Sequence, residues 1–192
     1  MSASKRPTPR RLFVYASAAA LVYLADPTPA GIVGGSVLVA AGLALRIWAC
    51  GHLEKNRLVV TTGPYAHVKN PLYLGSFLIT LGLLAASASA GPRGRWILFG
   101  FIPFVLAAYF VVYMPRKKRT EGGRLEAKFG EEWRRYDAAV PDFLPRLRPW
   151  RSGDARTFSW RRVLENHEPP MDLLVASLFL LVAFRPHLPG LG

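Results

Sequence analysis

Long apolar stretches separated by clusters of cations constrain the fold of this chain more than any other feature. Hydrophobic residues make up 51% of its 192 residues, yet the formal net charge is +13, so apolar and basic residues must be segregated along the sequence. Several apolar runs approach the roughly 20 residues that a helix needs to cross a bilayer. A soluble nucleic-acid-binding protein would not carry such runs, so the pattern favours an integral membrane protein with no nucleic-acid partner.

We therefore predict an all-α, polytopic bundle of about five transmembrane helices that forms a single domain over residues 1–192. The first run follows a basic N-terminus, and a signal peptide is its alternative interpretation. The second run is rich in glycine and alanine, which permit close helix contact in lipid. The five predicted spans are Leu12–Ala25, Gly31–Gly51, Pro71–Ala90, Trp96–Met114 and Met171–Phe184.

The cations fall on alternate connections between these spans. They occur in the N-terminal arm, at Lys55, Arg57 and Lys69, and along residues 116–162, whereas the other connections carry little charge apart from two arginines in one turn. Lys and Arg are retained on the cytoplasmic side, where anionic membrane lipids attract them. We expect the N-terminus inside, the C-terminus outside, and membrane lipids as partners of the basic face.

The segment Gly63–Gly75 places turn formers, cations, a histidine and two tyrosines directly before an apolar run. Asn70 is a good N-cap, and Pro71 suits the first helical position, where a missing N–H costs nothing. We expect a helix to begin there. Its first-turn N–H groups or the adjacent Lys69 would then be able to hold a carboxylate or a phosphate.

A second polar segment spans residues 116–137, where charged residues surround apolar ones at helical spacing. This pattern predicts an amphipathic helix at the cytoplasmic face, with Gly122-Gly123 and Gly130 as candidate breaks. An alternative is an interfacial helix that only anchors the chain. The apolar positions are Leu125, Phe129, Trp133 and Tyr136.

Together the two segments resemble the signatures of the integral-membrane methyltransferases that include isoprenylcysteine carboxyl methyltransferases and phospholipid N-methyltransferases. The first signature is Gly-Pro-Tyr followed by Asn-Pro-x-Tyr-x-Gly, within Gly63–Gly75. The second runs from Glu121 through Phe-Gly-Glu-Glu-Trp to Pro145, after one intervening helical hairpin. The resemblance covers about residues 45–149, so the first span and the extra C-terminal span at about 171–184 lie outside it.

The resemblance implies S-adenosylmethionine as the methyl donor, a lipophilic or membrane-embedded acceptor, and a site at the cytoplasmic membrane face. An aromatic face suits a sulfonium, and a carboxylate suits the donor's ammonium and ribose hydroxyls. Glu121 is expected to supply that carboxylate. The residues expected to contact the donor are Tyr65, His67, Lys69, Asn70, Pro71, Tyr73, Gly75 and Glu121.

The catalytic candidates are His67, Glu121 and Lys117. A carboxylate acceptor needs no base, whereas an amine must lose a proton, for which His67 or Glu121 is the candidate. Lys117 stands where the carboxyl methyltransferases have arginine. Lysine keeps the positive charge but lacks the guanidinium that binds a carboxylate through two hydrogen bonds. We therefore expect the acceptor to differ from prenylcysteine. Glu121 is followed by Gly122 where many relatives have a second glutamate.

Each of these residues also has an ordinary structural interpretation. Tyr65 and Tyr73 are typical of an aromatic belt, Gly75 of helix packing, and Glu121 of an ion pair with Lys117 one turn away. The alternative functions are an NADPH-dependent membrane reductase of the sterol type and a non-catalytic membrane scaffold. Cys50 is the only cysteine, which excludes a cysteine-cluster metal site, and we expect no metal.

Overall fold

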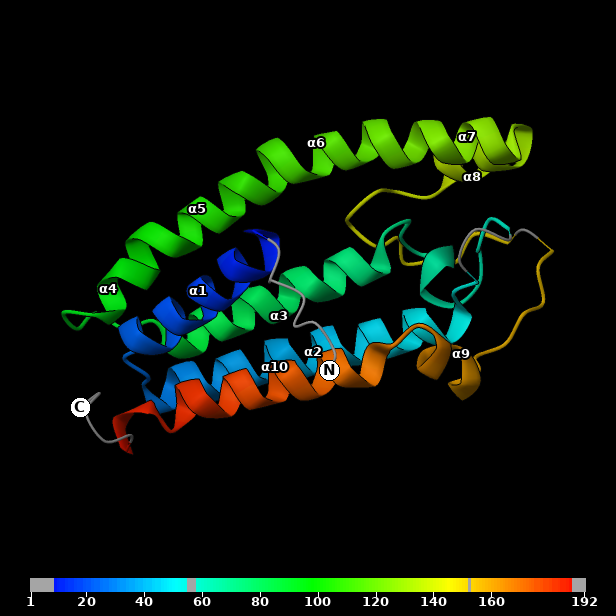
Figure 1. The fold of residues 1–192 in the computed structure, drawn as a ribbon. Helices are drawn as coiled ribbons and strands as arrows, with labels where there is room; N and C mark the ends of the chain where they lie inside the picture. Colours follow the sequence, from blue (N-terminus) through cyan, green and yellow to red (C-terminus); the bar gives the residue numbers. More distant parts are fainter. Residues whose placement is uncertain (1–8, 55–57, 152, 188–192) are drawn as a thin grey trace, which may run out of the picture.

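The computed structural model describes residues 9–54, 58–151 and 153–187, without the side chains of residues 9–14. Within these residues it consists of helices and connecting segments and has no strand, so the predicted all-α class is confirmed. The long helices run side by side along one direction (Figure 1). Besides one long helical run, the elements are α1 (Pro9–Leu24), α2 (Pro29–His52), η1 (Gly63–Ala66), α3 (Pro71–Ser87), α8 (Glu131–Ala139), α9 (Trp160–Glu165), α10 (Glu168–Ala183) and η5 (Arg185–His187).

The long run is a continuous helix of 36 residues from Gly94 to Phe129. It contains π-helical turns. The first ends two residues before Pro103, and the second ends two residues before Pro115. A proline lacks the N–H that would bond the carbonyl four residues earlier, and a wider turn accommodates this loss. Its parts are α4 (Gly94–Trp96), η2 (Ile97–Phe101), α5 (Ile102–Ala107), η3 (Ala108–Tyr113), α6 (Met114–Lys117), η4 (Lys118–Gly122) and α7 (Gly123–Phe129).

The predicted amphipathic helix is therefore the continuation of the fourth apolar run. Gly122 and Gly123 keep helical φ and ψ values, so the helix is not broken there. It ends at Gly130, whose φ of 54° and ψ of −122° are accessible in practice only to glycine. The chain reverses at this residue, and α8 folds back beneath α7 (Figure 1).

In the part of the chain that the structure describes, two helices are long and apolar enough to cross a membrane, Pro29–His52 and Gly94–Phe129, fewer than the five predicted. The helices at the other three apolar runs, α1, α3 and α10, have 16, 17 and 16 residues. At about 1.5 Å per residue such helices reach about 24–26 Å, short of a hydrocarbon core of about 30 Å. The prediction of about five spans was therefore wrong in number.

Helices α2 and α3 form the centre of the bundle, where glycines face glycines. A Cβ atom built on Gly35 would lie 2.5 Å from the Gly82 carbonyl oxygen, and one on Gly42 would lie 2.6 Å from that of Gly75. The two backbones are thus in direct contact at two levels. This confirms the close helix contact that the small residues of the second apolar run predicted.

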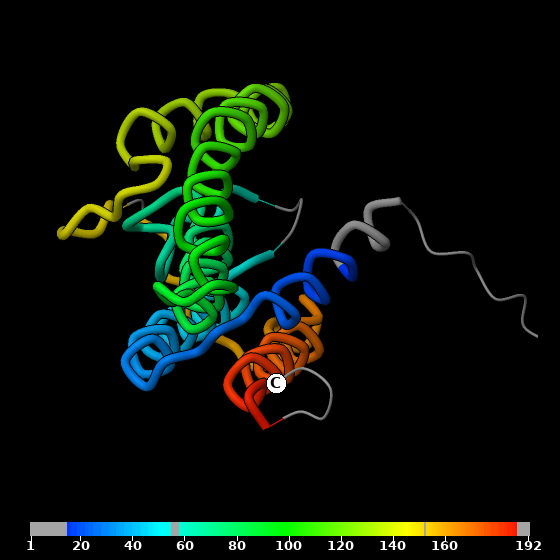
Figure 2. Tube along the Cα trace, turned by 90° about the vertical axis from the view of Figure 1, so that its left-hand side faces the viewer, coloured from blue at the N-terminus to red at the C-terminus, as the bar shows by residue number. Residues whose placement is uncertain are grey.

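Helix α10 packs beside α2, on the side away from the long helix (Figures 1 and 2). An ion pair joins the two helices, because Nη2 of Arg46 donates to Oε2 of Glu168 at 2.9 Å. The side chain of Glu168 is 4% exposed and that of Arg46 is 14% exposed. Nη1 of Arg46 also donates to Oγ of Ser76 in α3 at 2.6 Å, so this cation ties three helices together.

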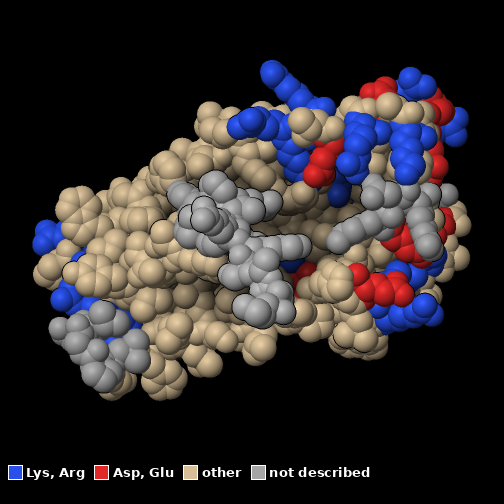
Figure 3. Space-filling view, in the orientation of Figure 1, with Lys and Arg blue, Asp and Glu red and all other residues tan. Residues whose placement is uncertain are grey.

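Charged side chains gather at one end of the molecule, over α6 to α9, while the middle of the bundle is almost uncharged on the face shown in Figure 3. A smaller group of cations lies at the opposite end. The cations at residues 1–8, Lys55 and Arg57, which support the predicted orientation, lie outside the described residues. The inside position of the N-terminus therefore stays a prediction.

Candidate functional site

The loop before α3 is bound along its length to the segment after α8. The backbone N–H of Lys69 donates to the Pro141 carbonyl at 2.9 Å, and that of Trp150 donates to the Ala66 carbonyl at 2.9 Å. The buried hydroxyl of Tyr136 donates to the Tyr65 carbonyl at 2.9 Å. These bonds bring the two signature segments, which are separate in sequence, into one structural unit at the charged end of the bundle.

Lys69 lies in the middle of this unit, and its side chain is only 5% exposed. Its ammonium contacts Asp137 at 2.6 Å and Asp142 at 2.9 Å. Burial alone would raise the pKa of Asp142, but hydrogen bonds from Lys69 and Lys118 outweigh it and hold the pKa below its ordinary value. Lys69 is therefore occupied by two internal carboxylates.

Asn70 precedes Pro71, the first residue of α3, as predicted, but its side chain makes no capping hydrogen bond. The amide Nδ2 instead donates to the Asp142 carbonyl at 3.0 Å, and Oδ1 accepts from the Lys117 ammonium. The first-turn N–H groups of Tyr73 and Leu74 both donate to the Asn70 carbonyl, at 3.1 and 3.0 Å. Two of the amides expected to hold a carboxylate thus already have the N-cap carbonyl as a partner.

Tyr73, Lys117 and Glu121 form a polar cluster between α3 and the long helix. The Tyr73 hydroxyl donates to Oε1 of Glu121 at 3.0 Å, and the Lys117 ammonium lies 3.3 Å from Oε2 of the same carboxylate. The ammonium also lies 3.6 Å from the centre of the Tyr73 ring. Because Lys117 is buried and Glu121 is half-exposed, the cluster presents a carboxylate to solvent above a covered cation.

A cavity of about 310 Å³ opens beside this cluster, between the end of α2, the start of α3, and α7 with α8. Most of the predicted donor contacts line it. His67 and Gly75 do not, because Nδ1 of His67 is 2.8 Å from the Arg146 carbonyl oxygen and Gly75 faces α2. The predicted residues that line the cavity are Tyr65, Lys69, Asn70, Pro71, Tyr73, Lys117 and Glu121.

An open apolar groove of about 890 Å³ runs along the long helix next to the cavity. Phe104, Ala107 and Val111 are among the residues that line it. Its polar end contains Tyr73, Lys117 and Glu121, which also line the cavity. The same three side chains thus lie between a cavity of mixed polar and apolar lining and a groove that is almost entirely apolar.

Sequence reasoning missed further residues on the cavity wall. Trp133 and Tyr136 were assigned only to the apolar face of a helix, yet both line the cavity, and burial raises the pKa of Tyr136. Glu54 and Arg124 add a second carboxylate and a further cation. Helical spacing identified the apolar residues, whereas no pattern in the sequence singles out Glu54.

The cavity has the kinds of groups that a zwitterionic nucleoside requires. Trp133, Leu58 and Val60 offer apolar walls for a base, two carboxylates can accept from hydroxyl or ammonium groups, and Arg124 or Lys117 can meet a carboxylate. The Tyr73 ring face, which was expected to meet a sulfonium, already carries the Lys117 ammonium. Within the described part of the chain, no group of three or more His, Cys, Asp or Glu residues could hold a metal ion.

Comparison with curated proteins finds distant relatives of two kinds. The chain is 32% identical over 121 residues to the cobalt-zinc-cadmium resistance protein CzcN of Cupriavidus metallidurans, covering 63% of this chain and 50% of that protein. It is 31% identical to the nickel-cobalt-cadmium resistance protein NccN of Alcaligenes xylosoxydans xylosoxydans, covering 56% of this chain and 46% of that protein.

The second kind is a membrane methyltransferase. The chain is 27% identical over 111 residues to a protein-S-isoprenylcysteine O-methyltransferase of Schizosaccharomyces pombe, covering 57% of this chain and 42% of that protein. This distant likeness gives weak support to the family resemblance, and the two resistance proteins match at higher identity. The chain spans half or less of the length of these relatives. No family model and no solved structure matches it.

Proposed function

We propose that this chain is a membrane-embedded methyltransferase that transfers a methyl group from S-adenosylmethionine to a lipophilic acceptor. The observation that carries the proposal is the Tyr73–Lys117–Glu121 cluster, which lines both the cavity with its charged groups and the apolar groove. A water-soluble donor and a lipid-soluble acceptor can meet at such a boundary and nowhere else on these two surfaces. The distant likeness to an isoprenylcysteine O-methyltransferase supports the same reaction class.

S-adenosylmethionine would supply an electrophilic methyl group, so the work of the protein is to position the acceptor and to exclude water from it. Glu121 lies where the cavity and the groove meet, and its carboxylate is the base that we propose for an amine nucleophile. Lys117 and Arg116 lie at the polar end of the groove and would attract an anionic headgroup. His67, bonded to the Arg146 carbonyl, has no role in this scheme.

Ligand-dependent stability tests the donor. S-adenosylmethionine should raise the melting temperature of the purified protein in detergent, and NADPH should not, because a ligand that binds the folded state stabilises it. A shift with NADPH alone would favour the reductase, and no shift with either ligand would favour the scaffold.

Variants locate the binding site. Glu121→Gln and Tyr73→Ala should each weaken donor binding, by about 1–3 kcal/mol where a charge-assisted hydrogen bond is lost. Glu126→Gln is the matched control, because Glu126 lies on the same helix and pairs with exposed Arg134 at 3.7 Å. Unchanged donor affinity in the Glu121 variant, measured by calorimetry, would assign this carboxylate to its ion pair with Lys117 alone.

The acceptor is tested with methyl-tritiated donor. Because Lys117 lacks the bidentate fork of arginine, we propose that the acceptor is a lipid or small lipophilic amine other than prenylcysteine. Total membrane lipid should take up label, and a farnesylcysteine analogue should take up little. Efficient labelling of the analogue by the unmodified protein would change the proposed reaction to carboxyl methylation.

A further inference from the structure

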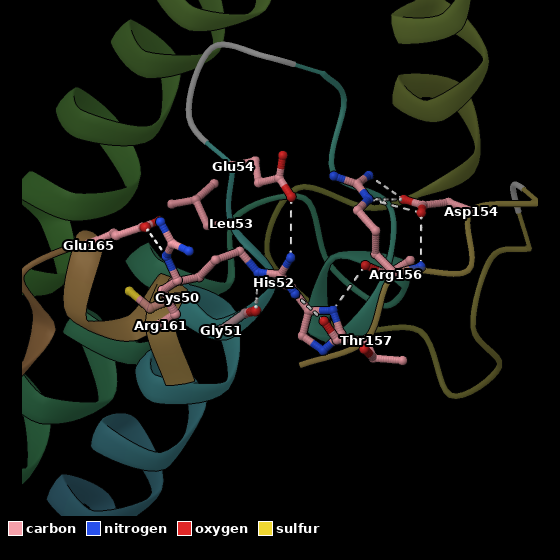
Figure 4. A network of polar contacts seen from close by, with 12 residues as sticks. Cys50, Gly51, His52, Leu53, Glu54, Asp154, Arg156, Thr157, Arg161 and Glu165 are labelled. Carbon is pink, nitrogen blue, oxygen red and sulfur yellow. Dashed lines mark hydrogen bonds and ion pairs between the residues drawn. The ribbon is translucent and has the colours of Figure 1, made fainter. Parts of the chain in front are cut away.

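Glu54 is a cavity carboxylate that lies just after the end of α2 and outside both signature segments. Its side chain is 27% exposed, and Oε1 accepts from Nη1 of Arg162 at 3.2 Å. In Figure 4 a dashed line marks the contact at one carboxylate oxygen of Glu54, and the other oxygen points away from that contact. Among the described residues this second oxygen has no hydrogen-bond partner, and Glu54 lines the cavity.

Side chains of α9 and of the residue that follows it hold the backbone next to Glu54 in place. Nε of Arg162 donates to the Gly51 carbonyl at 2.7 Å, and Nδ2 of Asn166 donates to the carbonyls of Cys50 and Leu53 at 3.2 and 3.1 Å. Cys50 and Gly51 belong to the last turn of α2, and Leu53 is the residue that caps its C-terminal end, so these bonds tie the end of α2 to α9 and the residue after it. Arg162 thus contacts both the end of α2 and the carboxylate that follows it.

The positions of the cavity and the groove indicate how a bound donor would be oriented. The reacting methyl group has to lie where cavity and groove meet, at Tyr73, Lys117 and Glu121. Glu54 and the neighbouring Leu58 line the cavity but not the groove. A donor with its methyl group at this boundary would place its nucleoside end toward Glu54, where Leu58 and Val60 offer an apolar wall for the base, and its amino-acid end near Glu121.

We propose that Glu54 binds the ribose hydroxyls of the donor, and that Arg162 is the positioning residue that aims its carboxylate. The inference rests on the proposed function. An ionised carboxylate accepts hydrogen bonds only, and two adjacent hydroxyls offer it two donors. The two cavity carboxylates then have different partners, with Glu54 on the diol and Glu121 on the ammonium.

Calorimetry with two probes tests the assignment, S-adenosylhomocysteine and its 2′,3′-dideoxy analogue. Glu54→Gln should weaken binding of S-adenosylhomocysteine by about tenfold to a hundredfold and leave binding of the dideoxy analogue unchanged. Arg162→Gln should show the same selectivity and add little to the Glu54→Gln loss, because both changes act on one contact. Arg161→Gln is the matched control, since Arg161 pairs with exposed Glu165 on the same helix.

The outcomes are distinguishable. Equal weakening of both probes by Glu54→Gln would show a structural role and overturn the assignment, as would unchanged binding of both. Failure of the unmodified protein to bind either S-adenosylmethionine or S-adenosylhomocysteine would overturn the proposed function and this inference with it. If Arg162→Gln does not fold, judged by its helical circular dichroism, the Glu54 comparison alone decides.

Discussion

Replacing Glu168 by glutamine should destabilise the bundle more than most single substitutions. This carboxylate is 4% exposed and lies against the Arg46 guanidinium at two pairs of atoms, one of them at 2.9 Å. It also accepts from Sγ of Cys50 at 3.4 Å. Glutamine keeps the size and one acceptor oxygen, so the change removes the negative charge and one acceptor while leaving the packing nearly intact.

The magnitude follows from what remains around Arg46. Its Nη1 group keeps the Ser76 hydroxyl at 2.6 Å and the Leu72 carbonyl at 3.2 Å. The positive charge, however, loses its counter-ion in a site where Arg46 is only 14% exposed. Removing one partner of a buried ion pair costs about 3–5 kcal/mol, whereas replacing both partners by apolar residues is often nearly neutral. The double variant Arg46→Leu with Glu168→Leu should therefore be more stable than Glu168→Gln.

Unfolding in mixed micelles, followed by helical circular dichroism, gives the free energies for this comparison. The control is Glu165→Gln, which breaks the 2.8 Å pair with Arg161 at side chains that are 57% and 87% exposed. Exposed pairs contribute about 0–1 kcal/mol, so the control should stay close to the unmodified protein. A Glu168→Gln loss no larger than the control, or a double variant less stable than the single one, would refute the reasoning.

Three further predictions concern other parts of the chain. Gly35→Ala should lower the free energy of unfolding by about 1–3 kcal/mol because its Cβ would lie 2.5 Å from the opposing backbone, whereas Gly34→Ala, with nothing within 4 Å, should have little effect. Gly130→Ala should cost about 1–3 kcal/mol because φ there is 54°, and Gly122→Ala, inside the helix, should stabilise by up to about 1 kcal/mol; equal effects in the same unfolding assay would contradict this contrast. Asp142→Asn should lower the melting temperature at neutral pH. The pKa of Asp142 is depressed in the folded state, so its stabilisation is present above the ordinary carboxyl pKa of about 3.9 and is lost as the pH falls through the folded value, where the two melting curves should converge.

The sequence was sufficient for the helical class, for the close contact of α2 with α3, and for the start of α3 at Pro71. These features depend on local patterns, namely apolar runs, glycine content and the Asn-Pro pair. The number of spans was not predictable in the same way, because apolar runs show hydrophobicity and not the residue at which a helix stops. The break predicted at Gly122-Gly123 failed for a related reason. Glycine inside a helix costs only about 1 kcal/mol, so the residues on either side keep the chain helical.

The candidate site was predictable only in part, because its contacts join residues far apart in the chain. Ring nitrogen Nδ1 of His67 meets a carbonyl 79 residues away, which no spacing rule indicates. Lys69 looked available for a ligand until the structure placed Asp137 and Asp142 around it. Glu54 has no local signal at all, and it depends on Arg162, in a segment that the family resemblance does not cover.

The continuous helix from Gly94 to Phe129 has a mechanical consequence for a protein in a bilayer. At about 1.5 Å per residue its 36 residues extend about 54 Å, while a hydrocarbon core of about 30 Å takes up about 20 of them. Groove residues such as Phe104 and cavity residues such as Glu121 therefore belong to one rod. We expect a change in bilayer thickness that tilts this helix to move its groove residues and its cavity residues together relative to Tyr73 in α3.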